Sequence, residues 1–228
     1  RKTLISVYFL SNRWGPLLIA ATKPKKKQLW SMIVKSKLGQ QAAVLEATGA
    51  NGIPVTALVR KVKPGDPTNI EAQAARRYWK LLFGDSFIRD RNSSGANALL
   101  NYGYAVLRAM VARSVVAAGL HPTLGIHHSN QGNPMRLVDD LMEPFRPLVD
   151  LTVWKLIESG KNHVTPDTKR AIVKSLYFPM ETEKGRSPVG DCIQRMATSL
   201  ALVYAGERED LELPLKMLPI ELASLLDH

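Results

Sequence analysis

Apolar residues recur at intervals of three and four along most of the chain, a spacing typical of helices that bury one face in a core. The first such stretch begins at Pro24, continues past Gly39 and runs toward Leu45. The same spacing predicts further helices over residues 54–62, 70–83, 96–118, 134–143, 145–159, 166–176 and 188–205. We therefore predict a mainly α fold.

Residues that start and stop helices punctuate these segments. Thr165 and Ser187 each precede a proline, so both are predicted N-caps. Gly119, Gly160 and Gly206 each follow the last apolar position of a segment and are predicted to end helices. The sequence contains no internal repeat and no low-complexity tract, so these helices are expected to form one helical domain.

The N-terminal stretch has a different pattern. Residues 3–10 are apolar and partly β-branched, and turn residues separate them from a second short apolar run at 17–20. We expect residues 1–22 to be the end of a small β-rich N-terminal domain with its linker, and residues 23–228 to be the helical domain. Because the chain starts at Arg1 rather than methionine, we also expect that the front of the natural protein is missing.

Length and composition exclude several classes of protein. With 228 residues, of which 45% are hydrophobic, the chain can bury one core and at most a small accessory domain. No run of apolar residues is long enough to span a membrane, and no signal peptide opens the sequence. The single cysteine, Cys192, excludes an internal disulfide and a cysteine-rich zinc site. These features fit a cytoplasmic protein.

Positive charge is concentrated at one end of the chain. Residues 1–63 contain 12 Lys or Arg against one acid, whereas the remaining residues contain 19 of each sign. The formal net charge of +11 therefore resides in the first quarter, and a one-sided positive surface attracts phosphate backbones. Lys25, Lys26 and Lys27 are its densest run. A solubilising lysine face would give the same pattern, so charge alone leaves both interpretations open.

Candidate chemistry is concentrated in residues 125–150. Asn133 followed by Pro134 is a predicted helix start, and Asp140 and Glu143 share a face of that helix because they are three residues apart. Pro144 is predicted to kink or end the helix directly after the last carboxylate.

Two histidines, His127 and His128, precede this helix in a Gly/Asn-rich loop that can fold back over it. A histidine beside several carboxylates, which include Asp139 as well as the helical pair, is typical of a divalent metal site. Acids on a solvated helix face and a surface histidine would produce the same residues. The apolar residues Leu137 and Leu141 favour the metal, because carboxylates on a helix packed into a core are costly unless paired or ligating.

Three long blocks of sequence resemble one known family. They are the string from His128 through DDLMEPFRPLVD, GDPTNIEAQAARRYWKLLFG at residues 65–84, and GANALLNYGYAVLRAMVAR at residues 95–113. In this order they resemble the CRISPR-associated adaptation integrase, the endonuclease that inserts new spacers for antiviral defence. The resemblance covers residues 23 to about 214. It is nearest to the branch found with type II systems, because the last acid is the glutamate of DLMEP.

The resemblance implies a catalytic site in the helical domain. Glu71, His128 and Glu143 match the family's metal ligands, and Asp140 matches the supporting catalytic acid. Glu71 also fits a second interpretation, since Thr68 to Glu71 has the form of a capping box that would only tie down a helix start. His127 is expected to support the site or to pack. One histidine and two or three carboxylates suit Mg²⁺ or Mn²⁺ better than zinc.

The reaction implied by the resemblance joins two DNA molecules. The 3′-hydroxyl of a prespacer attacks a phosphodiester at the edge of the CRISPR repeat, and a hard cation can activate that hydroxyl. The family works on double-stranded DNA as a homodimer, and it assembles with the small second universal adaptation protein into a heterohexameric complex. In the family an N-terminal β-domain carries the dimer and partner contacts, and we expect that this sequence holds only the end of that domain.

Arginines near the expected ligands are candidate clamps on the DNA backbone. Arg76 and Arg77 follow Glu71, and Arg146 follows Glu143. Ion pairs with neighbouring acids such as Asp139 or Asp150 would explain these arginines equally well.

Other functions remain open from the sequence. A basic helical DNA-binding module with a structural or inactive metal site is the main alternative, and a small-substrate metal hydrolase is a weaker one. A tyrosine recombinase is disfavoured because Tyr102 and Tyr104 are spaced as packing residues, and because carboxylates facing a phosphate require a cation between them.

Overall fold

A computed structural model of the protein describes residues 22–217, and this part of the chain is mainly helical, as predicted. The helices are α2 (Lys23–Ala47), α3 (Ile53–Val59), α4 (Ile70–Phe83), α5 (Ala96–Ala117), α6 (Arg136–Met142), the 3-10 helix η1 (Glu143–Phe145), α7 (Arg146–Glu158), α8 (Pro166–Ser175) and α9 (Val189–Tyr204). The strands are β1 (Pro179–Thr182), β2 (Gly185–Pro188) and β3 (Lys216–Met217). Gly119, Gly160 and Gly206 end helices with positive φ, as expected.

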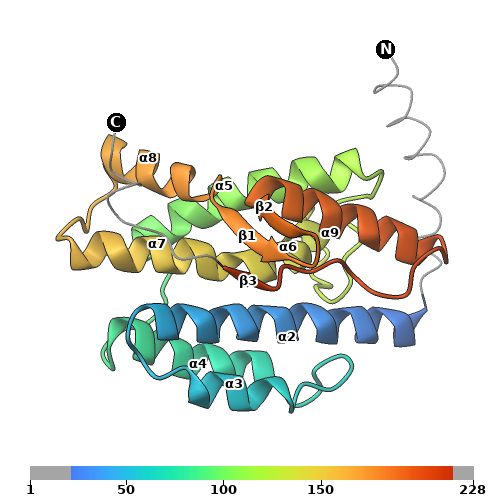
Figure 1. Cartoon of the computed structure of the whole chain (residues 1–228), viewed down its shortest axis with the longest axis horizontal. Helices are drawn as coiled ribbons and strands as arrows, with labels where there is room; N and C mark the ends of the chain where they lie inside the picture. The colour runs from blue at the N-terminus through green and yellow to red at the C-terminus, as the bar shows by residue number, and fades with distance from the viewer. Residues whose placement is uncertain (1–21, 218–228) are drawn as a thin grey trace.

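The long helix α2 runs through the middle of the fold (Figure 1), with α3 and α4 on one side and α6, η1 and α7 on the other. A helix covered on both sides must be apolar around most of its circumference. Accordingly Leu29, Trp30, Ile33, Val34 and Leu38 are all at most 1% exposed. The helices α5, α8 and α9 complete the larger layer.

The start of α2 follows from its sequence. The Thr22 side chain accepts a hydrogen bond from the Lys25 N–H at 3.4 Å, and Pro24 stands in the first turn. Thr165 caps α8 as predicted, in a reciprocal capping box with Thr168.

A small sheet interrupts the body that the sequence predicted to be all helical. The strand order is β2-β1-β3, and both pairings are antiparallel. Ser187 pairs with Met180 in this sheet, so its prediction as an N-cap is wrong, and α9 begins two residues later at Val189. Strands of four residues or fewer are too short for a pattern of alternation to show in the sequence.

The β-rich segment expected over residues 3–10 and 17–20 lies outside the described residues. Within the described part of the chain, no helix is both long enough and apolar enough to cross a bilayer.

Candidate metal and nucleic-acid site

The junction between α6 and α7 holds one end of the site. The helix α6 stops at Met142, and Glu143 opens η1 with Pro144 in its first turn, as predicted. The predicted N-cap at Asn133 is wrong, because α6 begins at Arg136 after Met135. Asn133 instead accepts a hydrogen bond from the Met135 N–H at 2.9 Å, and its amide donates to Asp139 at 2.6 Å.

Asp140 organises the loop that carries the histidines. Its carboxylate is fully buried and accepts the backbone N–H groups of Ile126, His127 and His128 at 2.6, 3.1 and 3.2 Å. The loop approaches so closely at Gly125 that a Cβ there would lie 2.5 Å from the His128 carbonyl oxygen and 3.0 Å from the Asp140 carboxylate. Glycine is therefore needed where the loop crosses the helix.

The same carboxylate orients His128. Nδ1 of His128 lies 2.6 Å from Asp140 Oδ1. This hydrogen bond, reinforced by the Asp140 charge and opposed by partial burial, raises the pKa of His128. A ring nitrogen held by a carboxylate in this way leaves the other nitrogen, Nε2, available as a ligand.

His127 has a packing role. Its ring stacks on the buried Trp30 ring, with centroids 4.2 Å apart and planes 3° from parallel. The sequence left open whether His127 supports the site or packs, and this stack ties the loop to α2.

Glu71 comes from the first turn of α4. The capping-box interpretation of Thr68 and Glu71 is wrong, because Asn69 is the N-cap and accepts a hydrogen bond from Ala72 N–H. The N–H groups of Ile70 and Glu71 are both satisfied by the Asp66 carboxylate at 2.9 Å. The Glu71 side chain is therefore not used as a cap.

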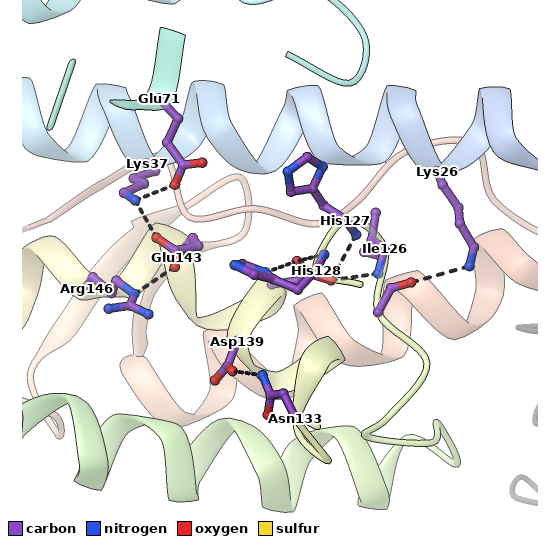
Figure 2. Close-up of polar contacts among 12 residues, drawn as sticks. Lys26, Lys37, Glu71, Ile126, His127, His128, Asn133, Asp139, Glu143 and Arg146 are labelled. Atoms are coloured by element: carbon purple, nitrogen blue, oxygen red, sulfur yellow. Dashed lines mark hydrogen bonds and ion pairs between the residues drawn. The ribbon is translucent and has the colours of Figure 1, made fainter. Parts of the chain in front are cut away.

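One lysine joins the carboxylates of Glu71 and Glu143 (Figure 2). Nζ of Lys37 lies 2.6 Å from Glu71 Oε1 and 2.5 Å from Glu143 Oε2. The three side chains are only 12%, 24% and 6% exposed, respectively. Burial alone would lower the pKa of Lys37, but Glu143 and Glu71 outweigh burial and raise it, so the amine is an ammonium.

Arg146 holds the other oxygen of Glu143. Its Nε lies 2.8 Å from Glu143 Oε1. Burial favours the neutral acid, but Arg146 and Lys37 keep the pKa of Glu143 below its usual value. Arg146 thus does form an ion pair, but with Glu143 rather than with the Asp139 or Asp150 that the sequence offered as examples. Asp139 is held by Arg108 at 2.6 Å.

A buried acid lies beside this cluster. Asp150 accepts hydrogen bonds from the hydroxyls of Tyr78, at 3.0 Å, and Tyr104. Burial raises the pKa of Asp150 from 3.8 to about 7, although both hydrogen bonds and Arg146 oppose that shift. Tyr104 also lies beneath the Arg146 guanidinium, whose carbon is 4.7 Å from the ring centroid. Tyr104 packs against the core, as predicted, and its ring and hydroxyl also form a polar wall of the site.

The three expected metal ligands gather in one region. Glu71 and Glu143 share Lys37, and Glu143 and His128 line the same cavity of about 290 Å³. In residues 22–217, no three His, Cys, Asp or Glu side chains lie close enough to hold an ion as they stand. The donor set of two carboxylates and an imidazole fits Mg²⁺ or Mn²⁺. Lys37 occupies the space between the two carboxylates.

An arginine-lined groove adjoins this cavity. Its volume is about 640 Å³, and it shares His128, Tyr104 and Arg146 with the smaller cavity. The arginines that line it are Arg89, Arg91, Arg108 and Arg146. A polyanionic backbone is the ligand that such a groove favours.

The residues that were predicted to contact DNA lie in different parts of the fold. Of these residues, only Arg146 lines the groove. Lys25 and Lys26 donate to the backbone carbonyls of Glu209 and Gly125. Arg76 is exposed, and Arg77 donates to the Pro54 carbonyl at 3.3 Å. The last of these residues, Lys27, packs the aliphatic part of its side chain near Gly65.

The site residues predicted from the sequence did not include Lys37, Arg89, Arg91 and Arg108. For Lys37 a signal existed, because it lies one turn after Ile33 and Val34 on the buried stripe of α2. A lysine on an apolar stripe needs a buried acid as its partner. Arg89 and Arg91 stand in a polar loop between α4 and α5, where no periodicity places them.

Comparison with known proteins agrees with this architecture. Residues 18–174 match the family described as CRISPR associated protein Cas1. A CRISPR-associated endonuclease Cas1 from Neisseria meningitidis serogroup C (strain 8013) is 40% identical over 210 residues, which are 90% of this chain and 68% of the relative.

Two solved structures share the fold. One is a casposase bound to integration product, with a TM-score of 0.71 and 22% identity over 92% of this chain and 67% of that one. The other is a partial Cas6-RT-Cas1–Cas2 complex, with a TM-score of 0.73 and 16% identity over 88% of this chain and 72% of that one. The family match confirms the resemblance found in the sequence, and this chain belongs to the Cas1 family of CRISPR-associated proteins.

Proposed function

We propose that the protein is a metal-dependent DNA integrase and endonuclease of CRISPR adaptation, which joins the 3′-hydroxyl ends of a prespacer to the CRISPR repeat by transesterification. The observation that carries this proposal is the gathering of Glu71, His128 and Glu143 beside a groove lined by arginines. The 40% identical relative is itself named as an endonuclease.

Each proposed ligand has a defined support in the chain. Glu71, His128 and Glu143 would hold Mg²⁺ or Mn²⁺, which when bound polarises a phosphodiester and activates a hydroxyl. Asp140 fixes the ring of His128 through Nδ1. Arg146 sits on Glu143 and over Tyr104, so it can meet a phosphate oxygen at the edge of the site.

The groove is suited to positioning DNA. Arg89 is held by Asn97 at 2.9 Å and by Asn101 at 2.7 Å, so its guanidinium is fixed before any ligand arrives. Fixed cations lose less entropy on binding than mobile ones. We propose that the groove takes the backbone of the strand that reacts, and that Lys25, Lys26, Lys27, Arg76 and Arg77 contact duplex further away.

The partners are proposals of the same kind. A casposase of the same fold is bound to an integration product, and a Cas1 protein of the same fold is assembled with Cas2. We propose that this protein binds double-stranded DNA, forms a homodimer and pairs with Cas2 in a heterohexameric integration complex.

One observation favours a second candidate function. The Lys37 ammonium already neutralises the Glu71 and Glu143 carboxylates, two of the three proposed ligands. A metal site blocked in this way is expected of a basic helical module that binds DNA without cleaving or joining it.

Strand transfer separates the two functions. A labelled prespacer and repeat-bearing DNA are incubated with the protein in Mn²⁺, Mg²⁺ or EDTA, with and without Cas2. The variants are Glu71→Gln, His128→Ala and Glu143→Ala, and the matched control is Asp167→Asn on the exposed face of α8. We expect metal-dependent joined product from the wild type and the control, and a loss of at least about a hundredfold in each ligand variant. DNA binding without product in any metal would support the binding module instead.

A further inference from the structure

Lys37 is the one cation that contacts two of the proposed metal ligands within the described residues, and the proposed function gives it no role. Its Nζ touches Glu71 from α4 and Glu143 from η1, while its own backbone belongs to α2. It therefore fastens together three elements that are far apart in sequence.

The two carboxylates depend on this ammonium. Because both contact the same nitrogen, their oxygens cannot be further apart than the two contact distances combined, at 2.6 and 2.5 Å. Two negative charges this close and this poorly exposed repel strongly in a low dielectric. Of the two carboxylates, Arg146 contacts only that of Glu143. Lys37 is therefore the positive charge that Glu71 and Glu143 share.

A divalent cation needs the same position. Carboxylate oxygens approach Mg²⁺ at about 2.0–2.1 Å, so an ion between Glu71 and Glu143 would overlap the Lys37 ammonium. Lys37 is also the cation better able to leave. It has a flexible four-carbon stem and lines the cavity of about 290 Å³, whereas Arg146 is held over the Tyr104 ring.

We propose that Lys37 is a positioning residue that stands in for the divalent cation: its ammonium holds Glu71 and Glu143 together in the metal-free protein and withdraws when the cation binds. This inference rests on the proposed metal site. The Lys37 ammonium and the divalent cation then compete for the same two carboxylates. As a consequence, Glu71 and Glu143 stay together in the metal-free protein, and they bind the cation less tightly than they would without Lys37.

Metal affinity tests this competition without any measurement of catalysis. Mn²⁺ binding is measured by titration calorimetry on the full chain, with Lys37→Met, Lys37→Arg and the exposed Lys35→Met on the same helix as matched control. We expect the Kd of Lys37→Met to be about tenfold lower than that of the wild type, because a repelling charge is gone. Lys37→Arg keeps the positive charge and should not lower the Kd, and Lys35→Met should leave the Kd unchanged. A Kd for Lys37→Met equal to or higher than that of the wild type would overturn the proposal.

A separate variant distinguishes failure of this inference from failure of the site. Glu143→Gln should lose Mn²⁺ binding whether or not Lys37 competes. If Glu143→Gln binds Mn²⁺ as the wild type does, the metal site itself is wrong. If it loses binding while Lys37→Met leaves the Kd unchanged, the site stands and Lys37 has no competing role.

A measurement on the unsubstituted protein covers the case in which Lys37→Met does not fold. Reductive methylation of lysines, followed by mass spectrometry, reports how accessible each amine is. In EDTA, Lys37 should react slowly because its amine is ion-paired and only 12% exposed. In Mn²⁺ its rate should rise several-fold, while the exposed Lys35 keeps the same rate. An unchanged Lys37 rate in saturating Mn²⁺ would show that the ammonium does not withdraw.

Discussion

His128 and Asp140 form a hydrogen-bonded pair in which Nδ1 of the ring lies 2.6 Å from a fully buried carboxylate. The same carboxylate accepts the N–H groups of Ile126 and His127. One acid thus sets both the path of the loop and the direction of the ring that it carries.

Replacing Asp140 with asparagine should reduce strand transfer by about 10- to 100-fold, the usual effect of losing a group that orients a metal ligand. The amide has one acceptor oxygen, and its NH₂ would face N–H donors that now point at the carboxylate. The measurement is the initial rate of joining in saturating Mn²⁺. Asp167→Asn serves as the control, and an Asp140→Asn rate equal to the control rate would remove Asp140 from the site.

The buried Asp150 should make stability depend on pH. Its pKa is raised to about 7, whereas the unfolded chain loses this proton near pH 4. The folded state therefore binds more protons in this window, so the free energy of unfolding should fall as pH rises, by at most about 1.4 kcal/mol per unit from this group. Asp150→Asn has no such titration and should gain stability relative to the wild type between about pH 5 and 7. Urea unfolding of both proteins measures the difference, and parallel pH profiles would show that Asp150 is ionised throughout.

Two helical glycines should respond in opposite directions to alanine. A Cβ at Gly103 in α5 would collide with Val149 Cγ1 and lie 3.1 Å from Ile172 Cγ2, so Gly103→Ala should destabilise by about 1–3 kcal/mol. At Gly39 in α2 a Cβ meets nothing within 4 Å, so Gly39→Ala should stabilise by about 0.5–1 kcal/mol. Chemical denaturation provides both values. Stabilisation by both variants would mean that α5 and α7 are not packed as closely as the structure has them.

The arginine groove should be visible in the salt dependence of DNA binding. Arg91 is exposed at its rim, and Arg91→Ala should weaken binding and lower the slope of log K against log salt by about 0.9 for one lost phosphate contact. Arg170→Ala on α8 removes the same charge away from the groove. Fluorescence anisotropy over a range of salt concentrations gives the slopes. Equal slopes for the two variants would place the DNA elsewhere.

The sequence predicted the helical fold well because periodic apolar positions and their punctuation are local signals. The bounds of α4, Ile70–Phe83, agree with the prediction at both ends. The hairpin of β1 and β2 was missed because its strands have four residues each and Ser187 next to proline resembles a helix start. Its sheet depends on pairing with the distant β3, which no local pattern encodes.

The candidate site was also predicted only in part from the sequence. The grouping of His128, Asp140 and Glu143 could be predicted because all three lie within one short stretch, and Glu71 came from the family resemblance. Lys37 reaches this stretch from a helix about a hundred residues earlier, and only packing brings it there. Asp150 was considered as an ion-pair partner, but its contacts with Tyr78 and Tyr104 depend on the crossing of three helices.

The position of a bound metal ion would show whether Glu71, His128 and Glu143 form the metal site. Crystals of the protein soaked in Mn²⁺ would be measured for anomalous scattering near the manganese edge. We expect a manganese ion about 2.0–2.3 Å from the Glu71 and Glu143 carboxylate oxygens and from Nε2 of His128, with the Lys37 ammonium moved away. A manganese peak away from these three side chains, in a protein that binds Mn²⁺ in solution, would contradict this expectation.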